Sequence, residues 1–234
     1  MRAIVAVIRI TIFATWSVFC IFLSLFSSLL LLSKKPTIFF AKHLWSPVAL
    51  FIMGAKLKVI GRENIQEKHS YVVMGNHCSY LDIPALFLAM PFHLHFIAKK
   101  ELKRMPFLGW YLVLSDMILI DRKNTAKAKE SLAEAVKLVN KGKHVVIFPE
   151  GTASKNGKMA PFKKGGFFMA EDAEAHIVPT HIKGSYEVFP SSKKLNMQRG
   201  TITVCIGKPI SPEEYKKFEM DDRVDYVKQL MQNL

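Results

Sequence analysis

From Leu57 to the end of the chain, short apolar runs alternate with longer segments in which apolar residues recur at helical spacing. The short runs are rich in β-branched and aromatic residues, a pattern typical of buried strands. They predict strands over residues 57–60, 71–74, 95–98, 117–120, 145–148, 177–182 and 201–206. The other segments predict helices over residues 83–90, 101–115 (apart from Pro106 and Gly109), 125–141, 165–175 and 212–234. This alternation indicates an α/β fold with a largely parallel central sheet flanked by helices.

The beginning of the chain follows a different pattern. No charged residue occurs from Ile10 to Ser33, where Leu, Ile, Phe and Val dominate. As a helix, this run is long enough to cross a bilayer core of about 30 Å. Basic residues on both flanks give no clear orientation. We expect a retained membrane-anchoring helix. A cleaved signal peptide is the alternative, although no small-residue cleavage site precedes Lys34.

A second, shorter apolar segment covers residues 37–53. It contains Lys42 and Trp45, a mixture typical of a helix at the headgroup level of a membrane. An ordinary core helix packed on the domain is the alternative. Beyond this segment, charges are regularly interspersed with apolar runs. We therefore divide the chain into N-terminal membrane-associated helices, residues 1–55, and an α/β domain, residues 56–234.

Composition narrows the class of partner. The 234 residues carry a formal charge of +14 at pH 7, and 50% of them are hydrophobic. A basic and apolar chain favours an anionic partner, either nucleic acid or a phospholipid surface. No nucleic-acid-binding module is recognisable, and nucleic acid would not explain the apolar N-terminal run, so we expect an anionic membrane. Three widely separated cysteines, Cys20, Cys78 and Cys205, suggest a reducing compartment rather than a zinc site or a disulfide framework.

The first candidate for chemistry is the pair His77 and Asp82. His77 follows a predicted strand, and Asp82 begins the next helical segment. The turn between them can fold the carboxylate onto the imidazole at the carboxyl end of the strand, the edge where ligand crevices form in α/β sheets. Such a carboxylate would orient the ring, so that its other nitrogen can accept a proton from a hydroxyl. The spacing alone also allows Asp82 to be a simple helix cap.

Two further predicted strands end in polar residues. Asp121 and Arg122 follow one of them, and Glu150, Gly151 and Thr152 follow another. If these strands are parallel neighbours of the first, all three ends project over one edge of the sheet. Arg122 suits bidentate phosphate contact, Gly151 permits close backbone approach, and Thr152 supplies a hydroxyl donor. The loop beyond adds lysines and a helix start that favour anions, namely Lys155, Lys158, Lys163, Lys164 and Gly165-Gly166.

Taken in order, these motifs resemble those of the 1-acyl-glycerol-3-phosphate acyltransferases, the lysophosphatidic acid acyltransferases of phospholipid synthesis. The family's first motif, Asn-His followed by four residues and Asp, matches Asn76, His77 and Asp82. Its second, third and fourth motifs match Ile120-Asp121-Arg122, Phe148 through Thr152 with Ser154, and Ile177-Val178-Pro179. The order and spacing agree over residues 56–209.

The resemblance implies a membrane-associated O-acyltransferase with the glycerolipid acyltransferase fold. It would move a fatty acyl group from acyl-CoA or acyl carrier protein to the free sn-2 hydroxyl of 1-acyl-glycerol-3-phosphate, giving phosphatidic acid. His77 and Asp82 would be catalytic, and neither a metal nor a cofactor is expected. The residues assigned to the substrate are Arg122, Glu150, Gly151, Thr152 and Lys164. We expect the inner membrane as the location, with the catalytic domain on its cytoplasmic side.

Two positions depart from the family motifs. Ala153 stands where the third motif usually has Arg, and Ser115 and Asp116 stand where the second usually begins with Gly. The missing cation at position 153 makes a related lysolipid acceptor an alternative. A hydrolase that cleaves the thioester with water and a non-catalytic lipid-binding protein on the same fold are further alternatives.

Overall fold

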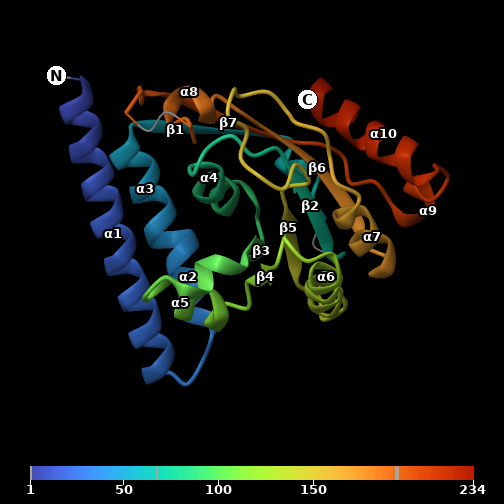
Figure 1. The fold of residues 1–234 in the computed structure, drawn as a ribbon, viewed down its shortest axis with the longest axis horizontal. Coiled ribbons are helices and arrows are strands. Elements are labelled where there is room, and N and C mark those ends of the chain that lie inside the picture. Colours follow the sequence, from blue (N-terminus) through green and yellow to red (C-terminus); the bar gives the residue numbers. More distant parts are fainter. Residues whose placement is uncertain (1, 67, 193–194) are drawn as a thin grey trace.

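The computed structural model describes residues 2–66, 68–192 and 195–234, which form a seven-stranded sheet with helices on both faces (Figure 1). The strands are β1 (Ala55–Ile60), β2 (Tyr71–Gly75), β3 (Leu94–Lys99), β4 (Ile118–Ile120), β5 (His144–Ile147), β6 (His176–Lys183) and β7 (Gly200–Ile206). Their order is β1-β7-β6-β2-β5-β3-β4. The strands from β6 to β4 are parallel, whereas β7 is antiparallel to β6 and parallel to β1. The predicted α/β class and largely parallel sheet are confirmed.

Successive residues of the central strands belong to two different cores. In β2, Tyr71 and Val73 belong to one core, and Val72 and Met74 belong to the other. Residues of α4 (Asp82–Ala89), α5 (Leu108–Leu114) and the N-terminal helices complete the first core. The second core is completed by α6 (Thr125–Asn140), α7 (Gly165–Asp172), α9 (Pro212–Tyr215) and α10 (Met220–Asn233). Burial of both faces explains why these strands are continuous apolar runs in the sequence.

The N-terminal helices lie along one flank of the domain (Figure 1). They are α1 (Arg2–Leu30), α2 (Lys35–Phe40), a π-helical turn (Ala41–Trp45) and α3 (Ser46–Met53). Trp45 Nε1 donates to Ser17 Oγ at 2.9 Å, which joins the second segment to α1. Gly54, with φ 74°, ends α3 immediately before β1, where the composition of the sequence changes.

The two apolar segments differ in how far they are buried. Ala3–Leu30, with mean hydropathy 2.2, and Lys35–Met53, with mean hydropathy 1.2, are both long and apolar enough to cross a membrane. Only 11% of the most apolar window of the first is buried, against 39% for the second. α1 therefore exposes an apolar surface and is the candidate membrane anchor, whereas the second segment also contributes Ile38, Ala41, Leu50 and Met53 to the first core.

Two helix predictions are wrong in extent. Residues 101–115 form a 3-10 helix (Lys100–Arg104) and α5, because the chain breaks at Pro106, which the sequence already marked as an exception, and at Phe107, whose φ of 61° is positive. Residues 212–234 form α9 and α10 with a turn between them. At the end of α9, the buried Tyr215 hydroxyl lies 3.0 Å from the Ala170 carbonyl oxygen. The apolar pattern also missed the short helix α8 (Ser185–Val188).

The topology brings the three polar strand ends to one edge of the sheet. β2 and β5 are adjacent and parallel, and β3 alone separates β5 from β4. The carboxyl ends of β2, β4 and β5 therefore project the same way, and the residues that follow them share one side of the domain.

Candidate active site

His77 and Asp82 form the centre of the site, just beyond the carboxyl end of β2. His77 Nδ1 lies 2.8 Å from Asp82 Oδ2. Because an ionised carboxylate only accepts hydrogen bonds, Nδ1 is the donor, and Nε2 of the neutral ring is an acceptor. The Asp82 side chain is fully buried, whereas 20% of the His77 side chain is exposed. A substrate that approaches from solvent therefore meets the imidazole and not the carboxylate.

Asp82 is held by the turn that precedes it. Its Oδ2 also accepts hydrogen bonds from the backbone N–H groups of Cys78, at 2.7 Å, and Ser79, at 2.8 Å. The ring of Phe148 stacks on His77 with a centroid separation of 4.2 Å and an interplanar angle of 15°. The imidazole is thus oriented at one edge by the carboxylate and on one face by an aromatic ring. Asp82 lies in the first turn of α4 and is not its cap residue, which is Leu81.

Asn76 has a structural part in this arrangement. Its Nδ2 donates to the Ile182 carbonyl at 2.9 Å, and its Oδ1 accepts from the Ile182 N–H at 2.6 Å. The buried amide thus continues the pairing of β2 with β6 beyond the last residue of β2. This fixes the backbone from which His77 projects.

The loop after β5 is fastened to His77 at two points. Glu150 Oε1 accepts from the His77 N–H at 2.9 Å, and its Oε2 accepts from the Ala160 N–H at 2.7 Å. The Ser154 N–H donates to the His77 carbonyl at 2.7 Å. Burial raises the pKa of Glu150 above its usual value, although the two N–H groups oppose this. Residues 151–153 therefore form a short arch beside His77, which we call the Gly151 arch.

Arg122 reaches the Gly151 arch from the end of β4. Its Nη1 donates to the Gly151 carbonyl. Gly151 has φ 76°, in the left-handed region that glycine adopts without strain. Thr152 is exposed on the same arch. The structure thus brings Arg122, Glu150, Gly151 and Thr152 together with the histidine.

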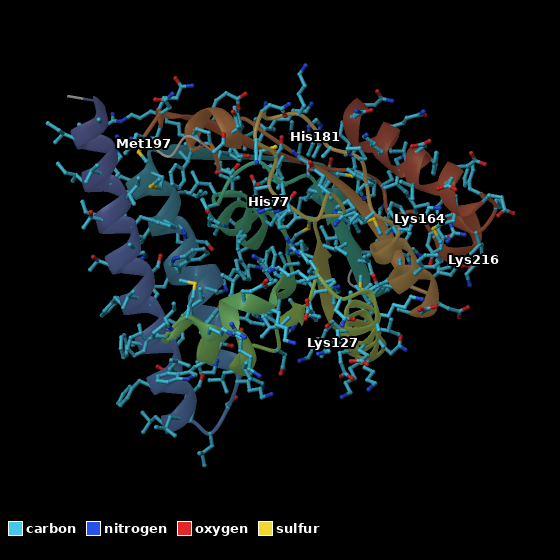
Figure 2. All side chains as sticks on the ribbon, viewed as in Figure 1. His77, Lys127, Lys164, His181, Met197 and Lys216 are labelled. Atoms are coloured by element: carbon cyan, nitrogen blue, oxygen red, sulfur yellow. The ribbon has the colours of Figure 1, made fainter. Side chains whose placement is uncertain are left out.

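The structure does not bring Lys164 to this group. Its Nζ forms an ion pair with Asp221 of α10 at 2.6 Å, and Figure 2 shows it beside α7, away from His77. The preceding residue, Lys163, lies against the arch instead: a methyl group placed on Gly151 would be 3.2 Å from Lys163 Nζ. Both lysines precede α7, where no periodic pattern fixes the direction of a side chain, so no signal in the sequence distinguishes them.

Cys78 is next to the base but lacks the properties of a nucleophile. Burial, with Asp82 and Glu150 nearby, raises the pKa of its thiol to about 12. Because the thiolate is the nucleophilic form of cysteine, this thiol is inert near neutral pH. Among the described residues, no group of three or more His, Cys, Asp or Glu side chains could hold a metal ion. The chemistry that these side chains themselves offer is proton transfer by His77.

The departure at Ser115 and Asp116 preserves a glycine-like turn. Asp116 has φ 54°, and Asp is among the few residues other than glycine that tolerate this region. Its carboxylate pairs with Lys34 at 2.7 Å and with Lys143 at 2.8 Å. The turn before β4 therefore adopts a positive φ without glycine, and its carboxylate also attaches the chain after α1 to the domain.

Comparison with known proteins shows the family. A family model described as Acyltransferase matches residues 56–183, more than half of the 234-residue chain. The chain belongs to the acyltransferase family. The match spans the His77 motif, Arg122 and the Gly151 arch, so the site described above lies within the shared region.

Relatives in the acyltransferase family share a common description. The chain is 36% identical over 187 residues to a 1-acyl-sn-glycerol-3-phosphate acyltransferase of Saccharomyces cerevisiae, covering 79% of this chain and 61% of the yeast protein. It is 33% identical over 224 residues to one from Chlamydomonas reinhardtii, covering 91% of this chain and 66% of that protein. The chain thus spans less than two thirds of the length of these relatives.

A solved structure of the acyltransferase family has the same fold. The crystal structure of the 1-acyl-sn-glycerophosphate (LPA) acyltransferase PlsC from Thermotoga maritima superimposes with a TM-score of 0.83 at 26% identity. The similarity covers 100% of this chain and 96% of that one. It therefore includes the N-terminal helices as well as the α/β domain.

Proposed function

We propose that this acyltransferase moves a fatty acyl group from a thioester donor to the free sn-2 hydroxyl of 1-acyl-glycerol-3-phosphate, giving phosphatidic acid for phospholipid synthesis. The observation that carries the proposal is the 2.8 Å hydrogen bond between His77 Nδ1 and Asp82, which prepares an oriented base beside a cationic loop. The names of the relatives support this acceptor. Acyl-CoA or acyl carrier protein is the donor, and no further cofactor takes part.

The proposed reaction is a direct transfer between two bound substrates. His77 Nε2 takes the proton of the acceptor hydroxyl as the hydroxyl oxygen attacks the thioester carbonyl carbon. Asp82 stabilises the imidazolium that forms. The tetrahedral intermediate then expels the thiolate, which receives the proton from His77, so that the products are an ester and a free thiol.

The acceptor headgroup binds at the Gly151 arch. In this proposal Arg122 contacts the phosphate, while Gly151 and Thr152 line the space beside His77. Glu150 has an indirect part, because its carboxylate holds the backbone of His77 and that of Ala160 at the distances given above. The site therefore depends on a carboxylate that touches no substrate.

We place the enzyme at an anionic membrane. The apolar surface of α1 and the formal charge of +14 support this location, since each well-placed basic residue contributes about 1 kcal/mol of attraction to an anionic leaflet. Both substrates carry acyl chains, and a membrane surface is where they meet. The catalytic domain would face the cytoplasmic side of the inner membrane.

The His77→Ala variant tests the proposal directly. Transfer of a labelled acyl chain from acyl-CoA to 1-acyl-glycerol-3-phosphate in lipid vesicles should be lost, with an unchanged circular dichroism spectrum. The matched control is His69→Ala, since His69 is exposed just before the amino end of β2, at the opposite edge of the sheet. Turnover retained by the His77 variant would exclude the mechanism.

A panel of acceptors separates the alternative functions. Ala153, where family motifs have arginine, favours comparison of 1-acyl-glycerol-3-phosphate with other lysolipids. Release of free fatty acid without ester formation would indicate a thioester hydrolase. Lipid binding without consumption of the thioester would indicate a non-catalytic protein. Repeating the assay with acyl carrier protein identifies the donor.

A further inference from the structure

Two cationic side chains from distant parts of the chain meet at Gly151. Arg122 Nη1 donates to the Gly151 carbonyl from the end of β4. The Lys163 side chain also lies close to Gly151, because a methyl group on Gly151 would be 3.1 Å from its Cε and 3.2 Å from its Nζ. The backbone of Lys163 is also tied to this loop, because its N–H donates to the Pro149 carbonyl at 2.8 Å. A guanidinium and an ammonium therefore border the same peptide unit.

This peptide unit is adjacent to the catalytic histidine. The Gly151 arch is tied to the His77 N–H through Glu150 at 2.9 Å and to the His77 carbonyl through Ser154 at 2.7 Å. Both cations thus approach the loop that is hydrogen-bonded to the backbone of His77. In the proposed acceptor, the phosphate is carried by the carbon next to the one that bears the reacting hydroxyl. A phosphate held at the arch would leave that hydroxyl near His77.

The charges of Arg122 and Lys163 are not neutralised locally. Among the described residues, neither side chain has a carboxylate partner within 4.0 Å, whereas Lys164 is paired with Asp221 at 2.6 Å. Glu150, the carboxylate next to Gly151 in sequence, is 4% exposed, and each of its oxygens accepts a backbone N–H. Glu101 lies near enough to Arg122 to raise the pKa of its guanidinium, against the larger lowering by burial, but it forms no ion pair with it. Two cations beside a base, without a close carboxylate partner, suit a ligand that carries about two negative charges, as a phosphomonoester does.

We infer that Lys163 is a specificity-determining residue, whose ammonium binds the acceptor phosphate together with Arg122 and supplies the cation that position 153 lacks. The inference rests on the proposed function and adds a residue to it. Its consequence is preference for a phosphomonoester headgroup over a neutral or zwitterionic one. Lys163 does not take part in proton transfer, so its effect is on acceptor binding and not on the chemical step.

Kinetics of Lys163→Met with two acceptors test this inference. Methionine keeps an apolar stem over Gly151 and removes the charge. The KM for 1-acyl-glycerol-3-phosphate should rise on the order of tenfold, while kcat and the KM for a monoacylglycerol stay unchanged. Lys164→Met is the matched control and should change neither KM. Adding Ala153→Arg to Lys163→Met should recover much of the affinity for the phosphate-bearing acceptor.

Equilibrium binding separates failure of this inference from failure of the proposed function. Binding of sn-glycerol 3-phosphate, titrated by NMR against glycerol, should be weakened by Lys163→Met and not by Lys164→Met, with unchanged melting of both variants. A wild-type protein that binds this anion through Lys163 but transfers no acyl group would sink the proposed function alone. An unchanged affinity in Lys163→Met, or an equal rise of KM for both acceptors, would overturn the inference.

Discussion

His77 and His144 lie at opposite edges of the sheet, on neighbouring parallel strands. His77 follows the carboxyl end of β2, where its Nδ1 donates to Asp82. His144 begins β5, where its Nδ1 accepts a hydrogen bond from the Tyr71 N–H at 3.3 Å. Both rings stack on a phenylalanine: His77 on Phe148 at 4.2 Å, and His144 on Phe92 at 3.7 Å. The packing is alike, and the hydrogen-bond partner of Nδ1 differs.

That partner decides what each ring can do. A carboxylate next to Nδ1 stabilises the protonated ring, which a general base needs after it takes a proton. At His144 the nitrogen is occupied as an acceptor, and burial, with His95 and His93 nearby, lowers the pKa to about 4. His144 is therefore neutral and structural near pH 7. The surroundings of His77 therefore stabilise the protonated ring, whereas those of His144 disfavour it.

Beyond His77→Ala, the largest effect is expected from Asp82→Asn, which removes the charge from the pair and keeps its shape. The asparagine oxygen can still accept from His77, Cys78 and Ser79, but the imidazolium loses its carboxylate. We expect kcat to fall by roughly 10³-fold, the size of a general-base contribution. Steady-state acyl transfer and thermal melting measure the two consequences separately.

The stability control for Asp82→Asn is its melting temperature, which should change little because a buried charge is removed rather than added. An activity within about tenfold of the wild type would be too small for loss of a general base. It would mean that Asp82 only organises the turn. The different Nδ1 partners of His77 and His144 would then not explain which histidine is catalytic.

Much of the fold follows from patterning alone. The strands agree with the structure within one or two residues at each end, because burial on both faces makes each a compact apolar run. The pattern could not locate the start of α5 or the turn before α10. The first depends on a left-handed Phe107, and the second on how Tyr215 packs against α7. Both are tertiary features that local periodicity does not encode.

The candidate site also has features that the sequence predicts and features that it does not. His77, Arg122 and Glu150 were predicted because each follows a strand, and the ends of parallel strands meet at one edge. The stacking of Phe148 on His77 and the choice of Lys163 over Lys164 were not predicted. They depend on side-chain direction in a loop. The spacing of residues in the sequence predicts at which edge of the sheet a residue lies. Which atoms its side chain contacts depends on the conformation of the folded loop.

The second largest effect is expected from Glu150→Ala, which disconnects the Gly151 arch from His77. The variant leaves the N–H groups of His77 and Ala160 without their acceptor. Loss of such partly buried hydrogen bonds costs about 1–3 kcal/mol of unfolding free energy, and we expect kcat/KM to fall on the order of tenfold or more as the arch moves. Urea unfolding and acyl transfer report both changes. A stable variant with full activity would show that the arch is held without Glu150.

A third prediction concerns acid stability and the opposite edge of the sheet. The pKa of His144 is lowered in the folded state to about 4, so the unfolded chain binds the proton more readily. The contribution of His144 to the free energy of unfolding is therefore fully present above about pH 6.5 and is lost as the pH falls towards 4. His144→Asn keeps an acceptor for the Tyr71 N–H and should flatten this slope.

The expected change for His144→Asn is on the order of 1–2 kcal/mol between these pH values, less than the full pKa difference would give, because the ring is partly exposed. Urea denaturation at several pH values measures it, and acyl transfer at pH 7 should be unchanged. His69→Ala is the control with an exposed ring. Equal acid slopes in wild type and His144→Asn would show that the other histidines carry the effect.

The smallest effect is expected from Cys78→Ala, which tests whether the thiol beside His77 takes part in the reaction. The Cys78 backbone N–H binds Asp82, whereas its Sγ makes only long contacts, such as 3.8 Å to the Gly157 carbonyl. Because alanine keeps the N–H, and because burial raises the pKa of the thiol to about 12, kcat should stay within about twofold of the wild type. Mass spectrometry of the wild type during turnover should detect no acylated Cys78. An acyl adduct on this thiol, or loss of activity in a folded Cys78→Ala protein, would replace direct transfer with a covalent route.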